Sequence, residues 1–366
     1  MPDSVPTKRV FLLAEQLRSK VPGGIGTHTE SLLKAISHVG DEYPSLDLEV
    51  IVSRGDNVAV LDKIGLPIRK LVLSHQLATG LAEMKIPYFG FESGVYHSFS
   101  IQVPPVLSVR QKAVVTVHDI AFISNPQFYT ARGIYWHKKQ LEYLSKGNQT
   151  VVSVSEKTRT DLIQYGISPN RIEVIESGAD HLDWPDFEEC RKILSKQGVQ
   201  ERFIISVSTI EPRKNLPGLI AGYKRAVESF SDLPELVVVG PEGWGTGLDP
   251  SENVHLLGPV PGPVLSALYR KAEMLVYVPF EEGFGLPVVE AMSVGLPVVS
   301  SDVPAASGCT ELADPRNESS ISQAIIRVLK DGELKKQLVS KGLKRAAQLT
   351  WMNSARKHLE LWDRLQ

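Results

Sequence analysis

Short runs rich in Val, Ile and Leu alternate along this chain with helix-length amphipathic segments. This alternation indicates parallel sheets wound with helices, because parallel strands need a long crossover between them. In the first half, the pattern predicts strands at 10–13, 48–52, 68–73, 94–99, 113–118, 150–155 and 172–177.

The rhythm breaks at residues 181–201, which begin as a polar connection with one proline and continue as a short helix. The same scheme then returns, which predicts a second domain. Its expected strands lie at 203–209, 236–240, 254–258, 274–280 and 296–301, followed by helices near 322–330 and 332–348. We therefore predict an α/β protein of two doubly wound, Rossmann-like domains, residues 1–185 and 186–350, with a ligand cleft between them. Residues 351–366 are predicted to form a C-terminal helix that packs back toward the first domain.

Composition narrows the class of protein. With 366 residues, 42% of them hydrophobic and 22% charged, the chain exceeds one ordinary domain and is not disordered. A net charge of -2 provides no field that would draw the molecule onto nucleic acid, so no nucleic-acid partner is expected. Cys190 and Cys309 form no metal-binding cluster, which favours reduced thiols in a cytosolic protein. No run of eighteen apolar residues occurs, which predicts a soluble or at most peripheral protein.

Ligands of such sheets collect beyond the carboxyl ends of the strands, so candidate sites must follow strands. Gly23, Gly24 and Gly26 precede an expected helix and would let backbone approach an anion, although they do not form GxGxxG and fit a structural turn equally well. His118 and Asp119 end a predicted strand. A histidine there is more often structural than catalytic, so both interpretations stay open.

The segment 281–299 contains two carboxylates on either side of a glycine-rich turn. Gly283 and Gly285 permit a tight loop, and Pro287 suits the first position of a helix whose N-H groups would face a diphosphate. Carboxylates accept hydrogen bonds from hydroxyls, so Glu282 and Glu290 suit a ligand with a phosphate centre and a sugar at each end, such as a nucleotide-sugar. The alternative is that Glu290 balances the helix dipole and Glu282 is solvated.

A second segment, 208–215, directly follows the first predicted strand of the second domain. Arg213 and Lys214 would neutralise the charge that grows on a departing diphosphate, and Asn215 is expected to cap the next helix. Adjacent cations are also common as solvated surface charges. The functional interpretation therefore depends on the position of Arg213 and Lys214 after a strand, and not on the pair itself.

Taken in order, GGIG, VHD, SVSE (153–156), SGAD (177–180), EPRKN and EGFGLPVVEAMSVGLPVVSSD resemble the retaining glycosyltransferases of family 4, which have the two-domain GT-B fold. The resemblance covers residues 21 to about 302, and its most specific part is the pair Glu282 and Glu290, eight positions apart. Within the family, the chain is most similar to bacterial mannosyltransferases that use GDP-mannose to build polysaccharides.

The resemblance implies a role for each matched residue. Glu282 would hold hydroxyls of the donor sugar and Glu290 the nucleotide ribose, while Arg213 and Lys214 would hold the diphosphate. The remaining expected contacts are those of His118 with the transferring sugar, of the backbone at Phe284, Gly285 and Leu286 with the sugar and phosphates, and of Gly23, Gly24 and Gly26 with the diphosphate. The first domain would then bind the acceptor and the second the nucleotide-sugar.

The sequence also departs from the family pattern. Ser208 and Thr209 stand where many members have Gly-Arg, and Ser177 and Ala179 replace the usual Asn and apolar residue of an NGVD-like turn, which leaves the function of that turn open. No D-x-D occurs, so neither a metal ion nor a cofactor is expected. Transfer would follow the family's front-face course, in which the acceptor attacks on the side that the diphosphate leaves.

The acceptor is expected to be a glycan or a lipid-linked sugar. Arg132, His137, Lys138 and Lys139, interleaved with Tyr135 and Trp136, form either a solvated helix face or an edge that contacts an anionic membrane from the cytoplasm. A dinucleotide-dependent oxidoreductase is disfavoured because it needs GxGxxG. A nucleotide-sugar epimerase and a non-catalytic GT-B binding protein remain alternatives, and the sequence does not determine the oligomeric state.

Overall fold

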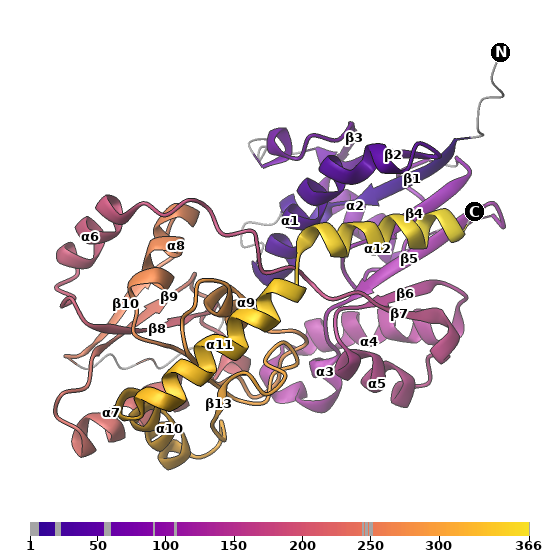
Figure 1. Ribbon diagram of the computed structural model, residues 1–366. Helices are drawn as coiled ribbons and strands as arrows, with labels where there is room; N and C mark the ends of the chain where they lie inside the picture. The colour runs from indigo at the N-terminus through magenta and orange to yellow at the C-terminus, as the bar shows by residue number, and fades with distance from the viewer. Residues whose placement is uncertain are drawn as a thin grey trace. The chain divides into compact units, whose positions relative to one another are not determined.

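The chain folds into two compact units (Figure 1). A computed structural model describes residues 7–18, 23–54, 60–90, 92–105, 108–243, 245, 248 and 252–365. Residues 1–178 and 351–366 form the N-terminal unit, and residues 179–350 form the C-terminal unit. The boundary expected from the sequence, after residue 185, lies a few residues beyond this division, in the segment before the next helix begins at Phe187.

The N-terminal unit is built on a sheet of seven strands among the described residues, all parallel, in the order β3-β2-β1-β4-β5-β6-β7. The strands are β1 (Lys8–Leu13), β2 (Leu46–Arg54), β3 (Ile68–Ser74), β4 (Gly94–Ser98), β5 (Gln111–Val117), β6 (Thr150–Ser153) and β7 (Ile172–Val174). The central strands are buried along almost their whole length, as expected for a parallel sheet covered on both faces.

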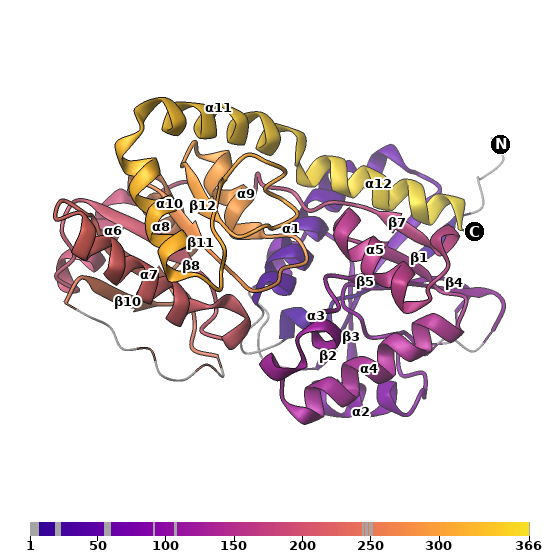
Figure 2. The ribbon, with the colours of Figure 1, turned by 90° about the horizontal axis from the view of Figure 1, so that it is seen from below.

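Helices from both ends of the chain cover this sheet. They are α1 (Gly23–Val39), α2 (His75–Glu83), α3 (Ala121–Ser124), α4 (Ala131–Lys146), α5 (Glu156–Tyr165) and α12 (Trp351–Arg364). Short 3₁₀ helices span Glu15–Arg18, Gly40–Glu42, Leu61–Lys63, Pro126–Phe128 and Pro169–Arg171. The yellow helix α12 packs against the indigo helix α1, so the last helix of the chain is part of the first unit (Figures 1 and 2).

The C-terminal unit repeats the scheme with six parallel strands among the described residues, in the order β10-β9-β8-β11-β12-β13. They are β8 (Phe203–Val207), β9 (Glu235–Val239), β10 (Val254–Gly258), β11 (Leu275–Tyr277), β12 (Val298–Ser300) and β13 (Glu311–Leu312). The helices are α6 (Phe187–Lys196), α7 (Leu216–Ser229), α8 (Gly262–Lys271), α9 (Leu286–Ser293), α10 (Glu318–Lys330) and α11 (Gly332–Gln348), and a 3₁₀ turn spans Pro212–Lys214. One core joins β8, β9 and β11 to α7 and α10.

Both sheets follow the doubly wound order, in which the chain first builds outward on one side of its opening strand and then on the other. The prediction of two doubly wound, Rossmann-like domains is confirmed. The expected strand at 274–280 is shorter in the structure, and the two-residue strand β13 was not predicted. Gly23, Gly24 and Gly26 do not precede the first helix but form its first turn, with Gly23 at φ +58°.

Candidate active site

The C-terminal unit brings two loops together where its strand order reverses. Strands β8 and β11 pair with each other, and their crossovers run in opposite directions, which is the place where doubly wound sheets form a ligand crevice beyond the carboxyl ends of the strands. Loops 208–215 and 278–285 follow these strands. The Phe280 amide donates to the Arg213 carbonyl over 3.0 Å, and Asn215 Nδ2 donates to the Val278 carbonyl over 3.1 Å, so the two loops are fixed to each other.

A buried carboxylate organises this crevice. Glu282 Oε2 accepts hydrogen bonds from Lys214 Nζ at 2.5 Å, from the Tyr277 hydroxyl at 2.7 Å and from Arg213 Nη1 at 3.4 Å. Lys214 Nζ also donates to the Tyr277 hydroxyl over 2.9 Å. No donor among the described residues reaches Oε1 of Glu282 within hydrogen-bonding distance, so one carboxylate oxygen is anchored and the other can accept hydrogen bonds from a ligand.

The electrostatics of this group keep Glu282 ionised. Burial alone would raise its pKa, but the neighbouring charges of Lys214 and Arg213 outweigh burial and lower the pKa to about 2. Burial, and then the charge of Glu282, raise the pKa of Tyr277 well above its usual value, so the phenol stays protonated and donates. The alternative that Glu282 is a solvated surface acid is wrong, because its side chain is only 13% exposed.

The two predicted cations are brought together as expected, but neither points to an empty space. Arg213 Nη2 also donates to Glu211 Oε1 over 3.1 Å, and the side chains of both cations are about seven-eighths buried. Two cations therefore face two carboxylates, Glu211 and Glu282, so this cluster is close to electrically neutral. A bound diphosphate would compete with Glu282 for Lys214.

Asn215 occupies the predicted position before α7, but it does not cap the helix with its side chain. Its backbone is left-handed, with φ 56° and ψ 35°, and its Nδ2 instead donates to the Val278 and Pro315 carbonyls, at 3.1 and 2.7 Å. Asn215 therefore connects the loops that follow β8, β11 and β13. The predicted capping role was wrong, because the amide is used to satisfy buried carbonyl groups.

Helix α9 begins at Leu286, directly after the second loop, so Pro287 is its second residue and not its first. Gly285 has φ +104°, and a Cβ there would lie 3.3 Å from Val303 Cγ2, which explains the glycine. Phe284 is buried, and its carbonyl accepts from the Ala305 amide over 2.9 Å. The backbone at Phe284, Gly285 and Leu286 is thus held in place at the N-terminus of α9, which is the positive end of the helix dipole.

Glu290 lies on α9 and is also buried. Its Oε2 accepts from the Tyr269 hydroxyl over 2.6 Å, and its Oε1 is 2.9 Å from His181 Nε2. Burial would raise the pKa of Glu290, but the hydrogen bond and charge of His181 lower it overall. Burial, and then the charge and hydrogen bond of Glu290, raise the pKa of Tyr269 well above its usual value, so this phenol stays protonated and donates.

Four residues of this site were not predicted: Tyr269, Tyr277, His181 and Glu211. Tyr277 ends a strand that otherwise reads as apolar, and a tyrosine at that place indicates a polar tip near the crevice. No comparable signal marks Tyr269 or His181, which the fold alone brings to Glu290.

The remaining predicted residues lie in the N-terminal unit. His118 follows β5, and its Nε2 donates to the Phe99 carbonyl over 3.0 Å. Its ring meets the His28 ring edge to face, with centroids 4.8 Å apart. His28 lies on α1, whose first turn contains Gly23, Gly24 and Gly26, so the sequence's two N-terminal candidates are neighbours in space.

Helix α4 contains the basic and aromatic segment, and some of its side chains are exposed while others are partly buried. Tyr135 is 69% exposed, and Arg132 and Lys138 are exposed as well. His137 instead packs against the Phe122 ring at 4.9 Å, and burial lowers its pKa, so it is not part of a basic surface. Among the described residues, no helix combines the length and apolar content needed to cross a bilayer.

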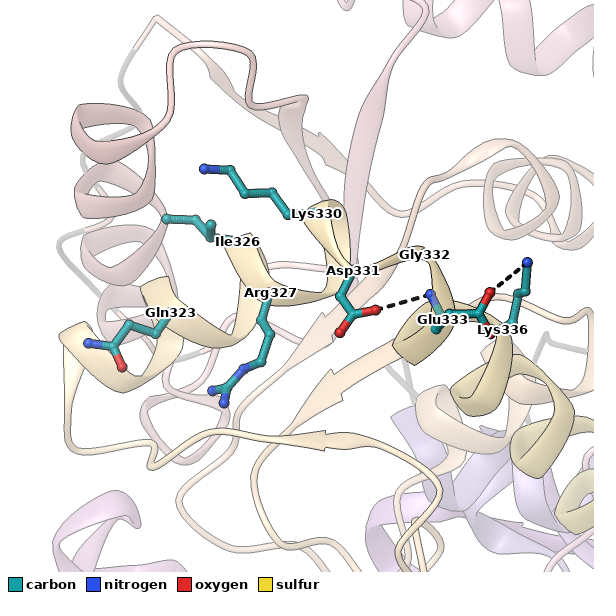
Figure 3. A pocket seen from close by; sticks show the side chains of 8 residues that line it. All are labelled: Gln323, Ile326, Arg327, Lys330, Asp331, Gly332, Glu333 and Lys336. Carbon is teal, nitrogen blue, oxygen red and sulfur yellow. Dashed lines mark hydrogen bonds and ion pairs between the residues drawn. The ribbon is translucent and has the colours of Figure 1, made fainter.

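A separate groove of about 730 Å³ lies where α10 meets α11 (Figure 3). Its charged groups already have partners: Asp331 caps α11, Lys336 pairs with Glu333, and Arg327 pairs with Glu311. Nothing in this groove resembles the chemistry of the Glu282 cluster. Within the described part of the chain, no group of three or more His, Cys, Asp or Glu side chains is arranged to hold a metal ion.

Two family models match the chain, "Glycosyltransferase Family 4" over residues 95–181 and "Glycosyl transferases group 1" over residues 187–345. The O-antigen chain mannosyltransferase B of Escherichia coli is 30% identical over 279 residues, which are 72% of either chain. The chain belongs to the family 4 glycosyltransferases. The glycosyltransferase is also 26% identical over 298 residues to the serotype-specific mannosyltransferase WbdA of Escherichia coli, and it covers only 36% of that longer protein.

The fold of the glycosyltransferase is that of GT-B enzymes. The crystal structure of Anabaena Alr3699/HepE in complex with UDP and glucose matches it with a TM-score of 0.70 over 97% of this chain and 99% of the other, at 18% identity. The fold class expected from the sequence is confirmed.

Proposed function

We propose that the enzyme transfers mannose from a nucleotide-sugar, with GDP-mannose as the first candidate, to a hydroxyl of a glycan or lipid-linked acceptor. The anomeric configuration would be retained, and no metal ion would be required. The observation that carries the proposal is the Glu282 cluster, in which a buried ionised carboxylate keeps one oxygen open beside two cations. The names of two relatives, both mannosyltransferases, support the choice of sugar.

The open oxygen of Glu282 would accept hydrogen bonds from hydroxyls of the donor sugar. Glu290 would accept from the ribose, since each of its oxygens has a second lone pair beyond those used by Tyr269 and His181. Between them, the backbone at Phe284 and Gly285 and the start of α9 at Leu286 would face the diphosphate. Gly23, Gly24 and Gly26 would approach the same phosphates, and His118 the transferring sugar.

The chemical step needs a place for the charge that grows on the departing diphosphate. Lys214 and Arg213 would provide it, because both are held beside the first turn of α9 before the ligand arrives, with the diphosphate competing with Glu282 for Lys214. The acceptor hydroxyl would attack from the side that the diphosphate leaves, and the leaving phosphate would take its proton. No second carboxylate is then needed as a nucleophile.

The acceptor would come from the side of the N-terminal unit. Exposed Arg132, Tyr135 and Lys138 on α4 support contact with an anionic membrane surface from the cytoplasm, where a lipid-linked acceptor would be found.

A thermal-shift series with EDTA present tests the donor site. GDP, UDP and ADP, each with its sugar nucleotides including UDP-glucose, are compared on the wild type, on Glu290→Ala and on Tyr269→Phe, with the exposed Glu188→Ala as the matched control. We expect GDP and GDP-mannose to stabilise the wild type and Glu188→Ala more than the two site variants. Stabilisation by UDP ligands alone would overturn the choice of donor, and no response to any nucleotide would overturn the site.

Transfer is tested separately with GDP-[¹⁴C]mannose and a lipid or glycan acceptor fraction. Radiolabel in the acceptor supports a transferase. Conversion of the donor sugar without transfer would favour an epimerase, and binding without any turnover would favour a non-catalytic protein.

A further inference from the structure

The chain passes between the two units twice, after Gly178 and before Trp351. Within the N-terminal unit these two residues touch so closely that a Cβ on Gly178 would lie 2.3 Å from the Trp351 nitrogen. Within the C-terminal unit, the Ala179 amide donates to the Leu349 carbonyl over 2.8 Å. The two passages therefore run side by side and form one paired connection. A paired connection permits fewer rotations than a single strand would.

His28 contacts both passages. Its Nδ1 is 2.9 Å from Ser177 Oγ, directly before the first passage, and its ring meets the Trp351 ring edge to face at 5.2 Å, where the second passage ends. His28 is only 1% exposed and Ser177 only 2%. Ser177 also stands where the family usually has asparagine. In this chain, the serine at that position forms a hydrogen bond with His28.

The hydrogen-bonding state of His28 follows from its surroundings. Its Nε2 is buried and has no partner among the described residues. A buried N-H without an acceptor is rarer in proteins than an unpaired lone pair, so the proton belongs on Nδ1, which donates to Ser177 Oγ. The His28 ring also meets the His118 ring edge to face, with 4.8 Å between the centroids. One neutral imidazole thus touches a predicted sugar-binding residue and both passages.

We propose that His28 is a positioning residue of the glycosyltransferase, which ties His118 to both passages and so restricts how one unit rotates against the other during turnover. The link to turnover rests on the proposed function, whereas the tie itself does not. If His28 only filled space, phenylalanine would replace it well, because phenylalanine keeps an aromatic ring. If the hydrogen bond of His28 to Ser177 ties the passages, phenylalanine would not replace it, because that bond is lost.

The test compares His28→Phe, His28→Asn and Ser177→Ala, with His38→Phe on the exposed face of the same helix as control. We expect His28→Phe and Ser177→Ala to lower kcat by about 10- to 100-fold, because small misplacements of reacting groups have effects of this size. The Kd for the nucleoside diphosphate should stay within about twofold, because Arg213 and Lys214, the charged groups proposed to hold it, are unchanged. His28→Asn, whose amide can donate in place of Nδ1, should recover most of kcat.

Amide hydrogen exchange tests this tie without an activity assay. In His28→Phe and Ser177→Ala, exchange should be faster than in the wild type in both peptides that contain the passages. In His38→Phe, exchange should be unchanged in both peptides. The proposal is overturned if kcat survives in folded His28→Phe, if Ser177→Ala keeps full kcat while His28→Phe loses it, or if only one passage loosens. Should the wild type transfer no sugar at all, the proposed function fails, and the exchange result alone still decides whether His28 ties the passages.

Discussion

The two units share a strand order and differ in the chemistry they bury. At the carboxyl ends of β8 and β11, the C-terminal unit buries ionised groups, with Glu282 held by Lys214 and Arg213. The N-terminal unit buries imidazoles. His97 accepts the Trp362 indole N-H at Nδ1 over 3.1 Å, and because an indole can only donate, His97 must be neutral.

This difference shows what the fold does and does not determine. The doubly wound order fixes where loops converge in both units, but the side chains decide whether the place can receive an anion. Buried neutral rings offer packing and hydrogen bonds at fixed angles, which suits holding a helix such as α12. Buried ion pairs keep charge ready for a ligand, which suits chemistry on a diphosphate.

The largest expected effect comes from removing the cation at the centre of the C-terminal cluster. Lys214→Ala should lower kcat by about 100- to 1000-fold, as loss of a charge-stabilising group does in other enzymes, with a smaller loss of donor affinity. The measurement is steady-state transfer with GDP-mannose, with exposed Lys196→Ala as control. Equal losses in kcat and affinity would mean that Lys214 only binds the ground state.

Acid should destabilise the N-terminal unit before the C-terminal one. Burial lowers the pKa of His358 from 6.5 to about 4, and the pKa of His28 and His97 shifts in the same direction. As the pH falls below 6.5, the unfolded chain binds protons that the folded chain does not. The unfolding free energy therefore decreases from pH 6.5 toward pH 4, by about 3 kcal/mol for His358 alone.

The C-terminal cluster has a different window. The pKa of Glu282 is lowered from 4.5 to about 2, so its contribution is complete above pH 4.5 and is lost only below it. Urea unfolding between about pH 7 and pH 5, with hydrogen exchange to resolve the units, measures the histidine window, in which Glu282 should contribute no slope. His358→Gln should flatten the slope and exposed His38→Gln should not. A pH-independent unfolding free energy over this range would contradict the assignment of neutral buried histidines.

The sequence predicted the sheets well because short Val/Ile/Leu-rich runs that alternate with helix-length segments are typical of buried parallel strands. It also placed Glu282, Arg213 and Lys214 in one site, since each follows a strand and the fold class brings such ends together. It failed where local geometry decides. Strand β13 has only two residues, too few for any periodicity, and the sequence does not show that Gly23, Gly24 and Gly26 lie within α1 and not in a turn before it.

The hydrogen-bond partners of Glu290 and Arg213 could not be predicted from the sequence for another reason. His181 lies 109 residues before Glu290, in a connection that reads as polar linker, so only the folded chain brings the two together. The charge balance around Arg213 was missed because Glu211, two residues away, reads as an ordinary loop acid. Sequence reasoning therefore found Glu282, Glu290, Arg213 and Lys214 but missed the side chains with which Glu290 and Arg213 pair.

A third prediction separates two roles of Glu282. Glu282→Gln removes a negative charge from a cluster that must accept a diphosphate, so free GDP should bind severalfold more tightly, as expected for about 1 kcal/mol of reduced competition. The same change weakens the acceptor for the sugar hydroxyls, so kcat should fall by about 10- to 100-fold. Calorimetry and transfer assays measure the two effects, with exposed Glu188→Gln as control. Weaker GDP binding would refute the competition between Glu282 and the diphosphate.

The smallest expected effect concerns the outer surface of the N-terminal unit, where charge is exposed and not buried. If α4 contacts an anionic membrane, Arg132→Glu and Lys138→Glu should each weaken sedimentation with phosphatidylglycerol vesicles by about 1 kcal/mol or somewhat more, roughly fivefold or above, and added salt should reduce the difference. Tyr135→Ala should weaken binding in a way that salt does not change, because its contribution is apolar. Lys196→Glu in the other unit controls for net charge. If Arg132→Glu, Lys138→Glu and Tyr135→Ala all bind the vesicles like the wild type, the basic face of α4 is a solvated surface, in contrast to the buried charges around Glu282.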